Sequence, residues 1–277
     1  MADLSILIVT FNTADELANC LASLRDHRPA VSHDIVVVDN ASTDGTVDMV
    51  RSNWPGVRLI ASPRNVGFAS ANNLGIRAVA SEMVLLLNSD TLVCAGAIDT
   101  LVSELRARPD LSAIGPRIVD PQGQVELSFG RMMGPFNELR QKCLVTLHAR
   151  HVGPVSRLVE RRTSRPQFPD WISGACLLVR RADALAAGLL DERYFLYAED
   201  VDFCAALRAR GQAIGFTPAA TIVHLRGASR RTRPEATEQA YRRSQIAFYD
   251  KHHPGWAGIL RLYLRLRGKL PAPGQRA

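Results

Sequence analysis

Two apolar segments of the chain end at a carboxylate, which is the pattern of a buried strand that delivers an acid to the edge of a sheet. They are residues 35–40 (IVVVDN) and residues 85–90 (LLLNSD). One strand-end aspartate is weak evidence for a site, because Asp also caps helices and begins turns. Two of them, Asp39 and Asp90, with a further acidic cluster downstream, predict a nucleotide and metal site at one sheet edge.

The downstream acidic cluster lies at residues 199–202 (EDVD), directly after an aromatic segment. Three carboxylates this close repel one another unless a cation or a proton-transfer role compensates. In an extended segment Asp200 and Asp202 share one face and Glu199 takes the other. At a helix start all three lie at the N-terminus, where the helix dipole offsets part of the repulsion. Acidic capping of a helix is the simpler explanation. The cluster occurs together with the strand-end acids in an alternating fold, however, and this combination favours a catalytic role.

His224 ends an apolar segment and precedes a loop that is rich in arginine. An isolated histidine is often structural. A histidine at a strand end before such a loop also suits a metal–diphosphate site, because imidazole binds the cation and guanidinium groups bind phosphate oxygens. The sequence therefore favours a ligand role for His224, with guanidinium groups supplied by Arg226, Arg230, Arg231 and Arg233.

The elements that must position these residues alternate between strands and helices, which predicts an α/β fold. We expect a single mixed, mostly parallel sheet flanked by helices. The predicted strands are 4–9, 35–38, 57–60, 85–88, 113–118, 170–180, 212–216 and 220–224, and the predicted helices include 15–24 (capped by Thr13), 71–80, 98–105 and 201–210. Residues 1–235 form the expected catalytic domain, with a basic insertion at about 135–168, and residues 236–277 form a helical, basic, amphipathic extension.

Length and composition indicate one large globular domain. The chain has 277 residues, of which 47% are hydrophobic. No apolar run approaches the ~18 residues of a membrane span, and the first residues lack the flanks of a signal peptide, so we expect a cytoplasmic protein. Five cysteines without metal-ligand spacing predict buried thiols. The arginines cluster in two loops without interleaved aromatic residues, which disfavours nucleic-acid binding.

Positive charge gathers in two segments. Residues 140–167 contain seven Lys and Arg against the single acid Glu160. This segment is either a solvated face or a surface for lipid head groups or a pyrophosphate-bearing acceptor. Near the C-terminus, helical spacing places Arg261, Arg265 and Lys269 on one face of a helix. The opposite face is apolar, is interrupted by Arg267, and consists of Trp256, Ile259, Leu260, Tyr263 and Leu270. Such a helix lies on an anionic membrane or docks on protein, and we expect a peripheral position on the inner face of the cell membrane.

Taken together, these motifs resemble those of family 2 glycosyltransferases, which have the GT-A fold, and most closely the bacterial rhamnosyltransferase-like members. The resemblance extends over roughly residues 4–226. It is specific for fold and reaction type and weak for the sugar. The residues that carry it are 8–12 (IVTFN), 38–45 (VDNASTDG), 65–68 (NVGF), 72–75 (NNLG), 87–90 (LNSD), 171–175 (WISGA), 199–202 (EDVD) and His224.

The resemblance implies a nucleotide-sugar donor and a divalent metal, Mg²⁺ or Mn²⁺. Asp39 would accept a hydrogen bond from N3 of a uracil or thymine ring. The first acid of the family's Asp-x-Asp motif is Asn88 here, so metal binding would depend on Asp90 and His224. Arg226 would bind the diphosphate together with Arg230. The implied donor-binding residues are Thr10, Asn12, Asp39, Asn40, Asp44, Gly67, Asn72, Asn88 and Ser89.

The resemblance also implies that Asp200 is the general base, since a hydroxyl is a poor nucleophile until a carboxylate accepts its proton. With base and diphosphate on opposite faces of the anomeric carbon, the transfer inverts its configuration. The expected acceptor and sugar residues are Trp171, Ser173, Gly174, Glu199 and Asp202. The donor suggested is dTDP-L-rhamnose, with UDP-sugars as the alternative. The acceptor would be a cell-envelope glycan or a polyprenyl-diphosphate-linked sugar, and homo-oligomerisation stays open.

Two other functions fit part of the pattern. A nucleotidyltransferase acting on sugar phosphates also combines a carboxylate-bound metal with a nucleotide. It requires a glycine-rich, basic loop near the first strand, however, and residues 10–13 (TFNT) are neither. A catalytically idle nucleotide-sugar-binding module would not need both Asp90 and Asp200. We therefore expect an inverting, metal-assisted glycosyltransferase.

Overall fold

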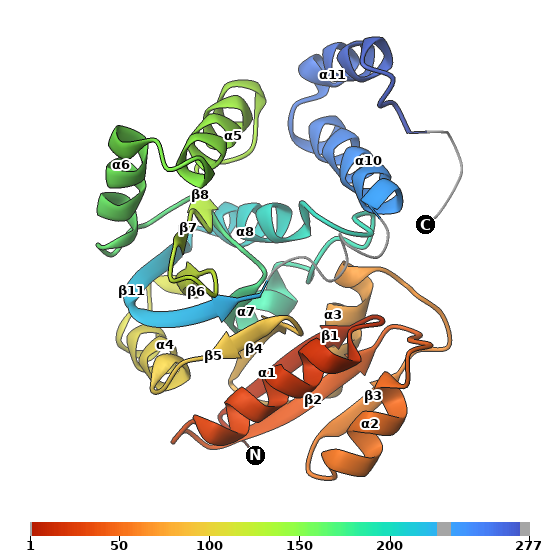
Figure 1. Ribbon diagram of the computed structural model, residues 1–277, viewed down its shortest axis with the longest axis vertical. Coiled ribbons are helices and arrows are strands. Elements are labelled where there is room, and N and C mark those ends of the chain that lie inside the picture. The colour runs from red at the N-terminus through yellow and green to blue at the C-terminus, as the bar shows by residue number, and fades with distance from the viewer. Residues whose placement is uncertain (1, 226–233, 272–277) are drawn as a thin grey trace.

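The computed structural model describes residues 2–225 and 234–271, and within them a nine-stranded mixed sheet lies at the centre (Figure 1). Its strands are β1 (Leu4–Thr10), β2 (His33–Asp39), β3 (Arg58–Ala61), β4 (Met83–Asn88), β5 (Thr91–Val93), β6 (Leu111–Val119), β7 (Val125–Glu126), β10 (Cys176–Arg180) and β11 (Ala213–His224). Their order is β3-β2-β1-β4-β10-β6-β11-β5, with β7 paired to β6.

One half of this sheet is parallel and brings the predicted strand ends together. Strands β1, β2, β3 and β4 run in the same direction, with Thr10 beside Asp39 and Val9 beside Asn88. Every residue of β1 is buried. Burial on both faces explains why these strands read as continuous apolar runs. The carboxyl ends of β1, β2 and β4 therefore meet at one edge, as the sequence predicted.

The other half of the sheet is mixed. Strand β10 is antiparallel to both β4 and β6, and β11 is parallel to β6 but antiparallel to β5. The last pairing sets His224 beside Thr91, the residue after Asp90. His224 thus reaches the site from a strand that is distant in sequence.

Helices cover both faces of the sheet (Figure 1). One core contains apolar residues of α1 (Ala14–Asp26), α2 (Thr46–Asn53) and α4 (Ala97–Ala107). The other contains apolar residues of α3 (Phe68–Ala78), α7 (Arg181–Ala186) and α8 (Glu199–Ala209). The predicted α/β layering, with helices on both faces of a central sheet, is confirmed.

A helical layer lies above the sheet in Figure 1. It consists of α5 (Pro135–Ala149), α6 (Gly153–Thr163), α10 (Pro234–His252) and α11 (Pro254–Leu266), with the small pair β8 (Phe129–Gly130) and β9 (Trp171–Ile172) beneath. Glu138 of α5 joins this layer, because it accepts hydrogen bonds from Tyr241 and Tyr249 of α10, both at 3.1 Å. In the described ranges, no helix is long and apolar enough to cross a bilayer.

Several elements differ from the prediction in ways that matter for the site. The predicted strand 170–180 is two strands, β9 and β10, separated by residues 173–175. Strands 212–216 and 220–224 form the single strand β11, with an irregularity between Thr217 and Thr221. The C-terminal helix ends at Leu266 instead of residue 270. Cys143 is exposed, so the prediction of buried thiols is wrong for that residue.

Candidate active site

Asp39 lies at the end of β2 with its side chain 1% exposed. Its Oδ2 accepts a hydrogen bond from the backbone N–H of Ser42 at 3.1 Å. Its Oδ1 is buried and has no hydrogen-bond partner among the described residues. A buried carboxylate oxygen without a donor is costly, so its retention indicates a ligand that supplies one. The N3–H of a uracil or thymine ring is such a donor.

The segment from Asn40 to α3 forms the next part of the site. Asn40 donates to Asn65 Oδ1 at 2.8 Å and accepts from Val66 N–H at 2.8 Å, which fixes the loop before Gly67. Gly67 has φ +87°, and a Cβ there would lie 2.8 Å from Phe195 O. The glycine thus permits close contact with the chain before α8. The predicted donor residue Asn72 is buried and bonds Phe68 O within α3.

Four other predicted nucleotide residues have contacts that hold loops in place. The Thr13 hydroxyl bonds both Thr10 and Ser89 instead of capping α1. Asn12 Oδ1 accepts from Thr43 N–H at 2.7 Å. Asp44 accepts hydrogen bonds from the starts of both α1 and α2. Partial burial opposes ionisation of Asp44, but these bonds hold its pKa below the ordinary value.

Asp200 lies in the first turn of α8, so the helical alternative for the acidic cluster is correct. Its Oδ2 accepts from Gly174 N–H at 2.9 Å and its Oδ1 from Val201 N–H at 2.8 Å. A Cβ on Gly174 would come within 3.3 Å of Asp200 Cβ, so glycine allows this approach. Ala175 O accepts from Asn88 N–H at 2.9 Å. These contacts connect Asp200 to the end of β4.

Glu199 and Asp200 form a buried acidic pair. Burial raises the pKa of Glu199 well above its ordinary value, and the charge of Asp200 raises it further. Burial also raises the pKa of Asp200, opposed by the N–H groups of Gly174 and Val201. Glu199 Oε2 has no hydrogen-bond partner within the described segments. Of the two, Glu199 is therefore the group that holds a proton more strongly, and Asp200, which accepts two N–H bonds, is the one that ionises more readily.

The helix that carries this pair begins in an unusual conformation. Tyr197 and Ala198, the two residues before it, have φ +69° and +68°. Non-glycine residues rarely adopt such angles, which cost of order 1 kcal/mol each and concentrate at functional sites. The strained turn directs the N-terminus of α8, and with it Asp200, toward Gly174.

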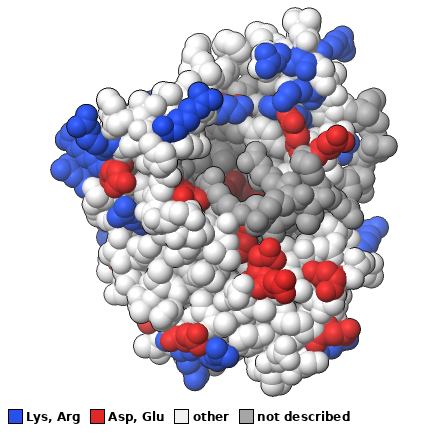
Figure 2. Space-filling model, in the orientation of Figure 1, with Lys and Arg blue, Asp and Glu red and all other residues white. Residues whose placement is uncertain are grey.

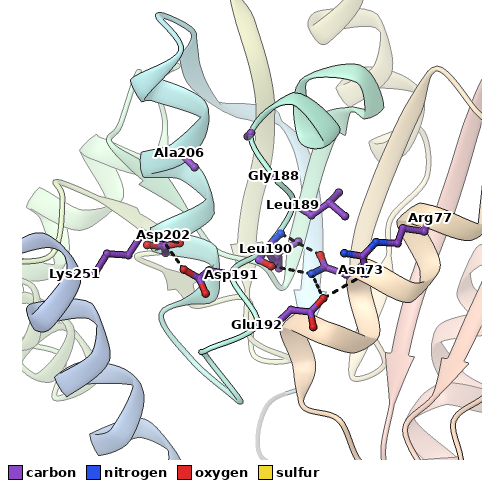
Figure 3. A pocket seen from close by; sticks show the side chains of 11 residues that line it. Asn73, Arg77, Gly188, Leu189, Leu190, Asp191, Glu192, Asp202, Ala206 and Lys251 are labelled. Atoms are coloured by element: carbon purple, nitrogen blue, oxygen red, sulfur yellow. Dashed lines mark hydrogen bonds and ion pairs between the residues drawn. The ribbon is translucent and has the colours of Figure 1, made fainter.

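Asp202 has contacts that differ from the predicted acceptor role. Its buried carboxylate accepts from Tyr194 Oη at 3.2 Å and Lys251 Nζ at 2.9 Å, and lies 2.6 Å from His252 Nε2. It also lines a cavity of about 350 Å³ that is shown in Figure 3. Lys251 and Asp191 also line that cavity. Among the described residues, Asp202 is the one predicted site residue in its lining. Asp202 therefore joins α8 to α10.

The predicted metal ligands lie in contact. His224 Nε2 is 3.2 Å from Asp90 Oδ1, and its Nδ1 is 3.4 Å from Glu126 Oε2. Burial lowers the pKa of His224, but the bonds to Asp90 and Glu126 outweigh it and raise that pKa to about 9. Asn88 Oδ1 is buried and has no partner among the described residues.

The described ranges contain no group of three or more His, Cys, Asp and Glu arranged to hold a metal. Asp90 and His224 nevertheless offer an O and an N donor in contact, and Asn88, two residues before Asp90, has a buried amide oxygen without a partner in the described structure. That partial set suits a cation whose remaining ligands are diphosphate oxygens and water, as is usual for Mg²⁺. The residues present therefore fit the predicted metal.

Figure 2 shows the molecule hollowed between the sheet and the upper helices, with acidic side chains in and below the hollow and Lys and Arg above it.

Beside the end of β4, Ser173 Oγ accepts from Ala175 N–H at 3.2 Å. Trp171 is half-buried and donates to Arg131 O at 2.8 Å. The predicted diphosphate residues Arg226 and Arg230 lie outside the described residues.

Comparison with known proteins decides the family. Residues 5–165, more than half of the chain, match the model of glycosyl transferase family 2. The chain belongs to glycosyltransferase family 2. It is 30% identical over 266 residues to the N-acetylglucosaminyl-diphospho-decaprenol L-rhamnosyltransferase of Mycobacterium tuberculosis, covering 91% of this chain and 86% of that protein. The chain is therefore a rhamnosyltransferase-like member of the family, as the sequence motifs predicted.

Solved structures support the GT-A fold. The mannosyltransferase PcManGT from Pyrobaculum calidifontis, in complex with GDP-Man and Mn²⁺, has a TM-score of 0.63 and 19% identity, covering 96% of this chain and 70% of that chain. Residues 1–349 of S. aureus TarS have a TM-score of 0.58 and 16% identity, covering 89% of this chain and 65% of that chain. At these identities the likeness concerns fold alone.

Sequence reasoning missed Glu126 in this family 2 glycosyltransferase. The residue belongs to the two-residue strand β7, which pairs with β6. It reaches His224, which is 98 residues away in sequence. An acid shortly after the predicted turn at 120–123 was the one available signal, and it does not specify a partner.

Proposed function

We propose that this protein is an inverting glycosyltransferase that moves L-rhamnose from dTDP-L-rhamnose to a hydroxyl of a polyprenyl-diphosphate-linked glycan. The observation that carries the proposal is the convergence of Asp39, Asp90 and Asp200 at one sheet edge, through the β1–β2–β4 register and the Gly174 contact. Membership of family 2 and the likeness to a rhamnosyltransferase named for a decaprenol-linked substrate support the choice of donor and acceptor.

The donor nucleotide would lie across the ends of β1 and β2. Asp39 Oδ1 would accept N3–H of the thymine, because it is the buried oxygen left without a partner in the described structure. Asn40 and Gly67 would line the path toward the sugar, since their loop is fixed by the Asn65 contact. Thr10, Asn12, Asp44 and Ser89 would act by holding these loops.

Asp200 would take the proton from the acceptor hydroxyl as that oxygen attacks the anomeric carbon. Its carboxylate is held by two N–H groups, which fix its direction. Protonated Glu199 beside it would keep a second negative charge away from the base. Attack on the face opposite the departing diphosphate gives inversion. Trp171, Ser173 and Gly174 would line the acceptor side, and Asp202 would act by anchoring α10.

Mg²⁺ or Mn²⁺ would be held by Asp90 and His224, with Asn88 Oδ1 close by, and when bound would stabilise negative charge on the leaving diphosphate. Glu126 would orient the His224 imidazole through Nδ1, so that Nε2 faces the cation. Arg226 and Arg230 would contact the diphosphate. A polyprenyl-linked acceptor further implies that the protein works at the inner face of the cell membrane.

The test is incubation with a panel of nucleotide sugars, Mg²⁺ or Mn²⁺, and an N-acetylglucosaminyl-diphospho-polyprenol acceptor, followed by measurement of released nucleotide and glycosylated lipid. We expect acceptor-dependent release of dTDP from dTDP-L-rhamnose. Formation of a nucleotide sugar from a sugar phosphate would instead identify a nucleotidyltransferase. Tight dTDP binding with no turnover for any donor and acceptor would identify a binding module.

A further inference from the structure

The exposed apolar side chains of this protein are concentrated at one end of the molecule. Eleven of the fourteen large hydrophobic residues exposed in the described part of the chain lie within residues 136–158 and 256–266. Phe136 is 76% exposed, Leu139 63% and Leu266 79%. Exposure on this scale, gathered in two short segments, marks an interaction surface.

Helix α11 presents two different apolar stripes. Ala257 and Leu264 are buried, and Leu260 packs against the hydrophobic cluster that includes Ala257, so this stripe attaches the helix to the protein. A second stripe points outward and is between 42% and 79% exposed; it consists of Trp256, Ile259, Leu262, Tyr263 and Leu266. Attachment to the protein therefore leaves most of the apolar surface of α11 uncovered.

The N-terminal ends of α5 and α11 are fixed to each other. The rings of Phe136 and Trp256 meet edge to face with centroids 6.1 Å apart. His253 Nε2 lies 2.8 Å from Met133 O, just before the two helices begin. Both helices lie at the top of the molecule in Figure 1. Their exposed apolar residues thus belong to one surface, which we call the α5–α11 surface (Phe136, Leu139, Trp256, Ile259, Leu262, Tyr263 and Leu266).

The two segments that carry the α5–α11 surface are rich in basic residues, of which Arg261 and Lys269 are paired with Asp250 and Glu238 of α10. Residues 135–168 and 254–270 together contain eleven Lys and Arg but two acids, Glu138 and Glu160. Glu138 is directed inward, where it binds Tyr241, Gln245 and Tyr249 of α10. Figure 2 shows Lys and Arg side chains along this upper part of the molecule. Apolar side chains bordered by basic ones match the interface of an anionic bilayer.

We propose that the α5–α11 surface docks on the surface of an anionic phospholipid bilayer. Apolar side chains of both helices enter the head-group region, and the bordering arginines bind lipid phosphates. Asp202 of α8 binds Lys251 and His252, immediately before α11, so the docked surface is joined to the helix that carries Asp200. If the acceptor is lipid-linked, as the proposed function has it, this connection orients the base toward the bilayer.

The experiment is flotation of the full-length protein with vesicles of phosphatidylcholine alone or with phosphatidylglycerol, at low and high salt. We expect binding to the anionic vesicles that weakens with salt. The paired substitutions Phe136→Ser with Leu139→Ser, and Ile259→Ser with Leu266→Ser, are each expected to weaken binding about tenfold or more, because two apolar side chains no longer enter the interface. Leu185→Ser on α7, 42% exposed and distant in the fold, is the matched control and should bind as wild type.

Equal binding to neutral and anionic vesicles, or wild-type binding by the α5 variant, would overturn the proposal. A wild-type dimer that the same substitutions convert to a monomer, with no vesicle binding, would identify a second copy as the occupant and overturn it as well. Thermal unfolding of each variant checks that it is folded. Flotation requires neither donor nor acceptor, so its outcome is independent of whether the proposed transfer reaction is correct.

Discussion

Replacement of Asp39 by Asn tests the nucleotide site through a single atom. In the wild type, Oδ2 binds Ser42 N–H and Oδ1 is buried without a partner in the described structure. An asparagine has one oxygen and one NH₂ group. Either the NH₂ faces the thymine N3–H, donor against donor, or it faces Ser42 N–H and breaks that bond. In both orientations the complex with dTDP has one hydrogen bond fewer at residue 39 than the wild-type complex.

A hydrogen bond to a charged group contributes about 1.5–3 kcal/mol, which corresponds to about 10–150-fold in the dissociation constant. We therefore expect Asp39→Asn to weaken dTDP binding by this factor in isothermal titration calorimetry. The free energy of unfolding should remain within about 1 kcal/mol of wild type or rise, because a buried unpaired carboxylate oxygen is itself costly. Weaker binding without lost stability is the expected signature.

The matched control is Asp34→Asn, on the same strand β2 but toward its other end, where Asp34 accepts from Ser5 at 2.5 Å. It should leave the dTDP dissociation constant unchanged. If the Asp39→Asn variant binds dTDP as tightly as wild type, the assignment of Oδ1 as the acceptor for thymine N3–H is refuted. Loss of binding that is explained by unfolding of the variant would instead contradict the predicted stability.

Three further predictions concern the pair beside the base, the tight glycine and the metal ligands. Because the pKa of Glu199 is raised in the folded state, its contribution to stability is present at low pH and is lost as pH rises through that pKa. Glu199→Gln cannot ionise, so denaturant titrations should show the variant gaining stability relative to wild type as pH rises. A stability difference that stays constant with pH would contradict this. Gly67→Ala should destabilise by about 2 kcal/mol more than Gly188→Ala, because both have similar φ (+87° and +88°) but only Gly67 would place Cβ 2.8 Å from another residue; equal unfolding midpoints would be inconsistent with the close approach. Glu126→Gln should weaken Mn²⁺ affinity about 10-fold or more in the presence of dTDP, measured by electron paramagnetic resonance, whereas unchanged affinity would remove Glu126 from the metal site.

The sequence was sufficient where local pattern and sheet geometry agree. The runs that end at Asp39 and Asn88 are buried on both faces, so their strands were recognisable, and parallel pairing forces their ends to one edge. Gly174, which the resemblance placed on the acceptor side, contacts Asp200 through its N–H group. The helical start of α8 was one of two stated alternatives, since acidic residues suit both.

What the sequence did not contain is the identity of partners across the fold. The resemblance placed Asp202 on the acceptor side, but the turn of the helix directs its carboxylate to Lys251 and His252 of α10. Glu126 was missed because a two-residue strand has no periodicity to recognise. The apolar residues of α5 gave no clear face until the contact between Phe136 and Trp256 joined that helix to α11.

The central claim is that the Asp200 carboxylate takes the acceptor proton in a transfer from the nucleotide sugar. It is tested most directly by comparing wild type and Asp200→Asn with dTDP-L-rhamnose, acceptor and metal, while measuring dTDP release and the anomeric configuration of the product. We predict inverted product from wild type, and a variant that binds dTDP normally but turns over about 10²–10⁴-fold more slowly. Release of dTDP by Asp200→Asn at the wild-type rate in the presence of acceptor would contradict the account.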